Sequence, residues 1–246
     1  MSQDFNKGTT TVGGIFTATN RSIKEPQLEF LADAAYTGGL NAIHFWKNKT
    51  YYLSGRAMFS GIYGSETAIT TLQRSPVRYY QRPDNDHVTY DPTRTSLSGY
   101  GGTAEFGKTG TGNWQYMTYV TFRSPGLEFN DAGYLRQADE IQQLFWMRYR
   151  KFKPFSVFRW ASANFTEYYT WDFGGDNINK GIDLNANGQF KNYYTSGVGF
   201  NYAGSTLARG ELWGGPALLL TPVTNFSAYA ETDSRQKLVL RFTTSH

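Results

Sequence analysis

The chain has 246 residues, of which 39% are hydrophobic and 17% aromatic, and its formal net charge is +4. This length suits one large all-β domain or a barrel of about a dozen strands, so residues 1–246 are treated as a single domain. The lysines and arginines are scattered rather than clustered, which argues against a nucleic-acid partner. No apolar run approaches the roughly 18 residues of a transmembrane helix, and residues 1–5 do not open a signal peptide.

Alternation of polar and apolar residues predicts twelve strands. In chain order they are expected at 9–19, 32–46, 51–63, 95–109, 113–123, 140–152, 155–173, 181–191, 193–203, 212–221, 226–233 and 236–244. The strands at 32–46 and 155–173 keep their alternation only if each contains a β-bulge. A short helix is expected at 65–75, with Ser65 as its N-cap.

The links between these strands alternate in length. Tight turns at 47–49, 110–112, 153–154, 192 and 222–225 alternate with longer links at 20–31, 64–94, 124–139, 174–180 and 204–211. Short turns on one side and long loops on the other are typical of outer-membrane barrels.

Residues 181–202 carry the clearest two-faced pattern. Ile182, Leu184, Phe190, Val198 and Phe200 share one parity, and polar residues occupy the other, so each set has its own face of a sheet. A soluble sheet would bury the apolar face in a core, whereas a membrane barrel would turn it to lipid. Strands of this length exceed the usual 5 to 6 or so residues and suit a tilted bilayer crossing of about 9 to 11, so we expect lipid contact.

Motifs for catalysis or cofactor binding are weak. Residues 102–109, GTAEFGKT, match the phosphate-loop pattern, but their alternation predicts a strand that ends at a hairpin. The three histidines lack zinc-ligand spacing and the loop acids lack EF-hand spacing, so neither a metal nor another cofactor is expected. No nucleophile or paired-carboxylate arrangement emerges, and no enzyme activity is predicted.

Polar side chains on the second parity are candidates to line a barrel lumen. These candidates are Arg56, Lys108, Arg123, Arg148, Arg150, Asp183, Asn185, Gln189 and Lys191. They either tune the passage of a solute or pair with one another across strands.

The segment 123–139, RSPGLEFNDAGYLRQAD, resembles the SPGFEVNDLGFLRRAD loop of a family of large outer-membrane β-barrels of unknown function, found chiefly in Bacteroidota. Further similar segments follow the same order at 72–75, 80–84, 189–193, 209–218 and 233–237. The resemblance implies a barrel that usually follows an N-terminal carbohydrate-binding-like domain, with no established catalytic residues. It directs attention to Asn130, Asp131, Arg136 and Asp139 as external-loop candidates.

The sequence therefore predicts an all-β, antiparallel up-and-down transmembrane β-barrel of about twelve strands, or a segment of a larger barrel. We expect it in the outer membrane of a Gram-negative cell, in contact with lipid and with a glycan or small solute, in envelope transport or surface glycan handling. The sequence leaves its oligomeric state open. The alternative is a soluble all-β carbohydrate-binding module, in which Trp146, Trp160, Trp171 and Trp213 line a sugar cleft and the apolar parity faces inward between two sheets.

Overall fold

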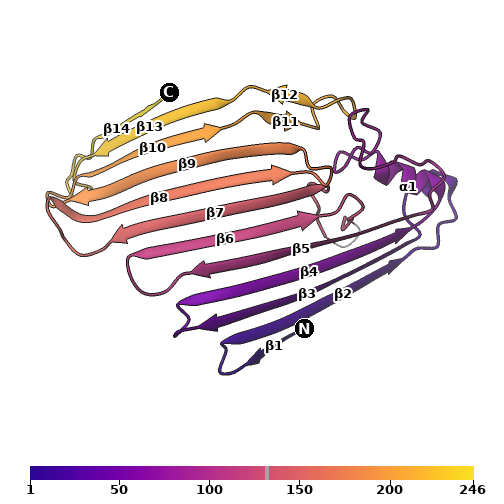
Figure 1. Cartoon of the computed structure of the whole chain (residues 1–246), viewed down its shortest axis with the longest axis horizontal. Coiled ribbons are helices and arrows are strands. Elements are labelled where there is room, and N and C mark those ends of the chain that lie inside the picture. The colour runs from indigo at the N-terminus through magenta and orange to yellow at the C-terminus, as the bar shows by residue number, and fades with distance from the viewer. Residues whose placement is uncertain (131–132) are drawn as a thin grey trace.

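One antiparallel sheet dominates the computed structural model, which describes residues 1–130 and 133–246. Twelve strands follow one another in the order β1 to β10, β13, β14, and the sheet is open, with β1 and β14 at its edges (Figure 1). The strands are β1 (Ser2–Phe5), β2 (Thr10–Asn20), β3 (Ala34–Trp46), β4 (Tyr51–Tyr63), β5 (Ser96–Lys108), β6 (Trp114–Arg123), β7 (Glu140–Lys151), β8 (Phe158–Trp171), β9 (Asn177–Phe190), β10 (Thr195–Ala203), β13 (Val223–Glu231) and β14 (Arg241–Ser245). Two further strands, β11 (Thr206–Ala208) and β12 (Leu218–Leu220), form a separate pair. The all-β antiparallel prediction is confirmed.

Most predicted strands are confirmed within a few residues, and the exceptions lie near the two ends of the chain. The strand predicted at 212–221 is wrong in extent, because residues 210–217 form turns, bends and irregular backbone and only Leu218–Leu220 pair with β11. The last strand, predicted at 236–244, begins only at Arg241, because residues 236–240 belong to the connection from β13. The predicted turn at 222–225 is also wrong, since Val223–Asn225 belong to β13. The first strand, Ser2–Phe5, was not predicted because its four residues are too few to show a period.

The predicted bulges have different outcomes. In β8 the register shifts between Phe158 and Trp160, and again between Thr170 and Trp171, as the irregular alternation required. In contrast, β3 pairs with both neighbours without a shift, and Ile43 lies on the polar side of the sheet.

The single α-helix of the described chain, α1 (Glu66–Gln73), confirms the predicted short helix. The Ser65 hydroxyl accepts a hydrogen bond from the Ala68 amide at 3.1 Å, which satisfies one of the free N–H groups of the first turn. A short 3-10 helix, Pro26–Leu28, lies in an earlier loop. No helix among the described residues is long and apolar enough to cross a bilayer.

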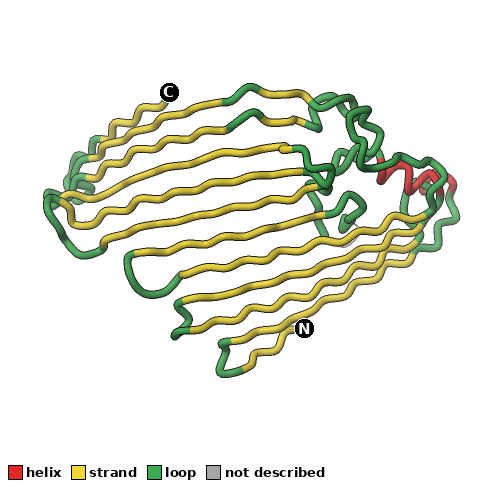
Figure 2. The backbone as a smooth tube through the Cα atoms, in the orientation of Figure 1, coloured by secondary structure: helices red, strands yellow, loops and turns green. Residues whose placement is uncertain are grey.

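The connections divide into two groups at opposite ends of the strands. Short turns lie at one end and the long loops with α1 lie at the other, as Figure 2 shows. The tight turn after β3 uses left-handed backbone at Lys47, Asn48 and Lys49, whose φ angles are 47°, 54° and 60°. The predicted alternation of short and long links is confirmed for most connections, but the link predicted as long at 174–180 is only residues 172–176, and most of the turn predicted at 222–225 belongs to β13.

The sheet has one apolar and one polar face. Cross-strand register aligns Phe165, Leu184, Phe200 and Phe226 on the apolar face. Exposed side chains run over this face from β2 to β14: Val12, Phe16, Leu40, Leu53, Phe59, Tyr100, Val120, Leu184, Val198, Phe226 and Phe242. Half-buried Gln143 and Glu167 interrupt it.

The buried core lies at the long-loop end. There Ile62 and Leu97 of neighbouring strands pack with Ile69 of α1 and with Tyr80. A second cluster joins Leu127, Leu135 and Ala138 of the loop between β6 and β7. A Cβ added to Gly99 would clash with the backbone of Leu127, so this loop lies directly on the polar face of β5. The core thus holds loops against the polar side of the sheet and leaves the apolar side uncovered.

Candidate functional site

Hydrogen bonds between strands cover the polar face. Thr103 and Thr121 pair at 2.9 Å between their hydroxyl oxygens, and Asn164 donates its side-chain amide to Asn185 at 2.7 Å. Asn185 in turn donates to Asp183 at 2.9 Å. Side-chain pairs of this kind stabilise neighbouring strands and also leave a polar surface that faces solvent.

The structure places seven of the nine lumen candidates on this face. They are Arg56, Arg123, Arg148, Arg150, Asp183, Asn185 and Gln189. Several make cross-strand pairs: Arg123 bonds to Glu140, Arg148 to Gln115, and Gln189 accepts from Arg159 at 2.9 Å. These partners lie on neighbouring strands but are not themselves lumen candidates.

The other two candidates were assigned to the wrong place. Lys108 aligns with Tyr51 and Tyr116, which belong to the apolar face, because alternation along β5 puts it on the side of Phe106. Lys191 lies in the exposed turn after β9, where the strand alternation has ended.

A buried ion pair fastens the loop between β6 and β7 to the loop that carries α1. Arg78 and Glu128 meet at 2.6 Å, with 0% and 1% of their side chains exposed. Arg78 also donates to the carbonyl oxygens of Leu72 at 3.0 Å and of Leu127 at 2.8 Å. The backbone amide of Glu128 donates to the hydroxyl of Ser60 on β4 at 2.9 Å, so the loop is fixed to the sheet as well.

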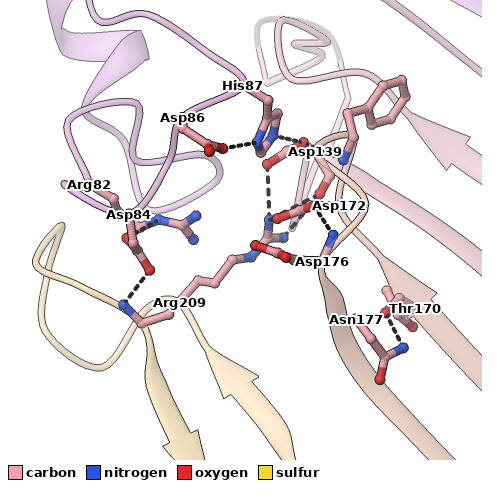
Figure 3. A network of polar contacts seen from close by, with 12 residues as sticks. Arg82, Asp84, Asp86, His87, Asp139, Thr170, Asp172, Asp176, Asn177 and Arg209 are labelled. Carbon is pink, nitrogen blue, oxygen red and sulfur yellow. Dashed lines mark hydrogen bonds and ion pairs between the residues drawn. The ribbon is translucent and has the colours of Figure 1, made fainter.

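A second polar cluster joins four loops around Asp139 (Figure 3). One Asp139 carboxylate oxygen bonds to His87 Nε2 at 2.9 Å and accepts from the Phe173 amide at 3.1 Å. The other oxygen accepts from Arg209 at 3.0 Å, and the guanidinium also donates to the Asp139 carbonyl. Arg209 lies 4.0 Å from Asp172, whose other oxygen accepts from the amide of Asp176. We call His87, Asp139, Asp172 and Arg209 the loop cluster.

The loop cluster contains a set of metal-type donors. The ligand atoms of His87, Asp139 and Asp172 lie within 4.8 Å of one another. However, both oxygens of Asp139 already accept hydrogen bonds, and the Arg209 guanidinium supplies the positive charge beside both carboxylates. The arrangement suits a charge-assisted clamp between loops better than a cation site.

Arg82 extends the charged region toward the loop between β10 and β13. Its side chain is 3% exposed and lies 3.4 Å from Asp84, which accepts from the amide of Ala217 at 2.8 Å. Burial and the like charge of Arg209 lower the pKa of Arg82, and Asp84, Asp139 and Asp172 oppose that shift. The loop after β10 is thereby tied to the loop after β4 as well as to Asp139.

The four external-loop candidates have different environments. Asp139 is buried at the centre of the loop cluster, whereas Arg136 is exposed. Asn130 stabilises its own loop, since its side-chain oxygen accepts from the amide of Leu135 at 2.8 Å. Asp131 lies outside the described residues.

One family of known proteins matches both the sheet and the loops of this chain. A family model described as a domain of unknown function, DUF5916, matches residues 15–246. The chain belongs to this family. No curated protein and no solved structure matches it. The DUF5916 match begins within β2 and includes every residue of the loop cluster, so the cluster lies in the part shared with the family model.

The buried polar contacts of this DUF5916 chain are only partly indicated by its sequence. Asp139 is an external-loop candidate in the sequence, but nothing in the spacing of the loop residues indicates that Arg209 is its partner or that Arg78 and Glu128 pair. These contacts join residues 50 and 70 positions apart, and only the packing of the loops brings them together. The single available signal was that all four residues fall in the long predicted links.

Proposed function

We propose that this DUF5916 chain forms the wall of a transmembrane β-barrel with a polar lumen. The observation that carries the proposal is the exposed apolar face, which continues across the sheet from β2 to β14. Phe16, Leu40 and Val198 on this face are 64%, 65% and 62% exposed. Contiguous apolar surface on this scale marks a surface that another apolar phase covers.

Aromatic residues flank this face at both ends. Near the short turns, Trp46 stacks with Tyr51 and Phe106, and Trp114 lies 4.8 Å from Tyr149 between ring centroids. Near the long loops, a second belt contains Tyr36, Tyr63, Tyr100, Phe122, Tyr169 and Trp171. Small and aliphatic residues, such as Ala104, Ala163 and Ala186, lie between the belts. Two aromatic girdles around an apolar band are typical of outer-membrane barrels.

The dimensions agree with a bilayer. A strand rises about 3.3 Å per residue and barrel strands tilt by about 40°, so residues 51–63 would span about 30 Å of membrane. The polar face, with its paired amides and charges, would then line the lumen, and the loop at 124–130 would lie inside it against β5.

The proposal requires the two edges of the sheet to be paired. Backbone groups left free in lipid cost several kcal/mol each, so the outer edges of β1 and β14 must pair with each other or with further strands. Placement in the outer membrane of a Gram-negative cell, and a part in envelope transport or surface glycan handling, rest on the resemblance of residues 123–139 to the Bacteroidota barrel family.

A soluble carbohydrate-binding module is less compatible with these observations. It would place the apolar parity inward between two layers, yet the main sheet contacts of the described residues join neighbouring strands and the residues of the apolar parity remain exposed.

The experiment compares a lysine on each face at one depth of β9. Leu184→Lys should weaken insertion into lipid vesicles by about 2 to 4 kcal/mol, because the new charge lies on the lipid side. Asn185→Lys is the control, because its side chain lies on the polar face next to Asp183. Insertion is followed by flotation with vesicles and by heat-modifiable gel migration. If the unmodified protein stays in plain buffer as a monomer and L184K behaves like N185K, the barrel proposal is wrong.

A further inference from the structure

The two ends of the sheet differ in charge. The short connections at 6–9, 47–50, 109–113, 152–157, 191–194 and 232–240 contain six lysines and one arginine but a single acid, Asp233. The long loops at the opposite end, which hold every member of the loop cluster, contain more acids than cations. The positive net charge of the chain is therefore concentrated at the short-turn end.

The lysines of the four hairpins from β3 to β10, including those at the strand ends, form what we call the basic rim. They are Lys47, Lys49, Lys108, Lys151, Lys153 and Lys191. Lys47, Lys49, Lys153 and Lys191 are exposed in turns, and Lys108 and Lys151 end their strands on the apolar face. Among the described ion pairs, none joins a rim lysine to a carboxylate within 4.0 Å. The rim charge is thus available to an external anion.

The rim lysines lie next to the aromatic belt. The Lys151 amine lies 4.4 Å from the ring centroid of Phe155, and the Lys47 amine lies 5.7 Å from that of Tyr51. Aromatic rings at the membrane interface sit at the level of the lipid headgroups, and long lysine side chains reach from the apolar boundary into that layer. If the belt lies at the interface, the rim amines lie at the depth of the lipid phosphates.

We propose that the basic rim binds the headgroups of anionic phospholipids in the leaflet on the short-turn side. This inference rests on the proposed barrel, since the belt fixes the depth of the rim. The rim amines are distributed over four successive hairpins, so they face the layer of phosphate groups at the membrane surface along a broad arc. Each anionic headgroup attracts an amine that lies within a Debye length of it. An acidic protein partner would have no need of the adjoining aromatic belt.

The test reconstitutes the whole chain into vesicles that contain brominated phosphatidylglycerol or brominated phosphatidylcholine. Bromine quenches tryptophan fluorescence on contact, and Trp46 and Trp114 lie on the apolar face at the rim. We expect phosphatidylglycerol to be preferred at least about threefold in low salt, and the preference to shrink near 1 M salt, where the Debye length is about 3 Å.

Two variants of equal charge separate the rim from the net charge. The rim variant K47Q/K49Q/K153Q/K191Q should lose the preference. The control K24Q/R74Q/R94Q/R136Q removes four exposed cations from the long loops and should keep it. Equal preference in both variants, or no preference in the unmodified chain despite quenching by both lipids, would overturn the inference. Absence of quenching by either lipid would instead refute the barrel, and the inference with it.

Discussion

Replacement of Glu128 by glutamine tests whether the buried ion pair holds the loop between β6 and β7 on the polar face. Glutamine keeps the size of the side chain and the acceptor for the Asn130 amide, but it removes the charge that balances Arg78. Both side chains are almost fully buried, and an uncompensated buried charge costs about 3 to 5 kcal/mol. Since about 1.4 kcal/mol corresponds to a tenfold change in an equilibrium, the loop should open at least about 100-fold more often.

Hydrogen exchange measured by mass spectrometry on peptides from 124–139 reports this opening directly. The matched control is Glu140→Gln, which breaks the ion pair with Arg123 at the base of the same loop, where the side chains are 30% and 20% exposed. A partly exposed pair contributes about 1 kcal/mol or less, so exchange should rise by less than about tenfold. Similar, small effects of the two substitutions would refute the reasoning that burial makes the Arg78–Glu128 pair decisive.

Two further predictions concern the loop cluster and the turn between β13 and β14. Asp139→Asn should raise exchange in peptides covering 172–176 and 204–217 by up to about the same factor as E128Q, because it removes the carboxylate that lies 3.0 Å from Arg209 and leaves only Asp172, 4.0 Å away, beside the guanidinium. Asp176→Asn, at an exposed side chain, should change exchange little, and equal effects of the two substitutions would contradict the clamp. Hydrogen bonds from Arg235 hold the pKa of Asp233 well below its usual range, so the carboxylate stabilises the turn above about pH 3.9 and this stability falls as the pH drops further. The rate of pepsin cleavage at the exposed Leu238–Leu240 segment should be higher in D233N than in the unmodified chain near pH 5, and the two rates should approach each other as the pH falls to 2. A ratio of the two rates that does not change with pH would contradict this prediction.

The regular part of the fold could be predicted from the sequence because its signal is local. Alternation over ten or more residues predicted β4, β6 and β9, and the polar breaks between alternating segments at 47–49 and 192 predicted their turns. Alternation fails where a strand is short, as in Ser2–Phe5, or where glycine and proline break an apolar run, as before Leu218. It also cannot extend past a strand end, which is why Lys191 was misplaced.

The buried polar contacts could not be predicted because they depend on loop packing. His87, Asp139 and Arg209 come from three loops, and no periodicity relates them. Alternation also cannot predict whether the sheet closes into a barrel. It sets which face of each strand is apolar but not which strands pair at the edges.

The two ends of the sheet use their charges differently, and this difference supports the separate roles proposed for them. At the long-loop end, the cations Arg78, Arg123 and Arg209 each bond to a carboxylate, so their charge is neutralised within the fold. A charge that is paired and buried contributes little to the field outside the protein, whereas an exposed unpaired lysine acts over about a Debye length. The long-loop end therefore uses these three arginines to fix the position of loops over the polar face, whereas none of the described ion pairs joins a lysine of the basic rim to a carboxylate within 4.0 Å.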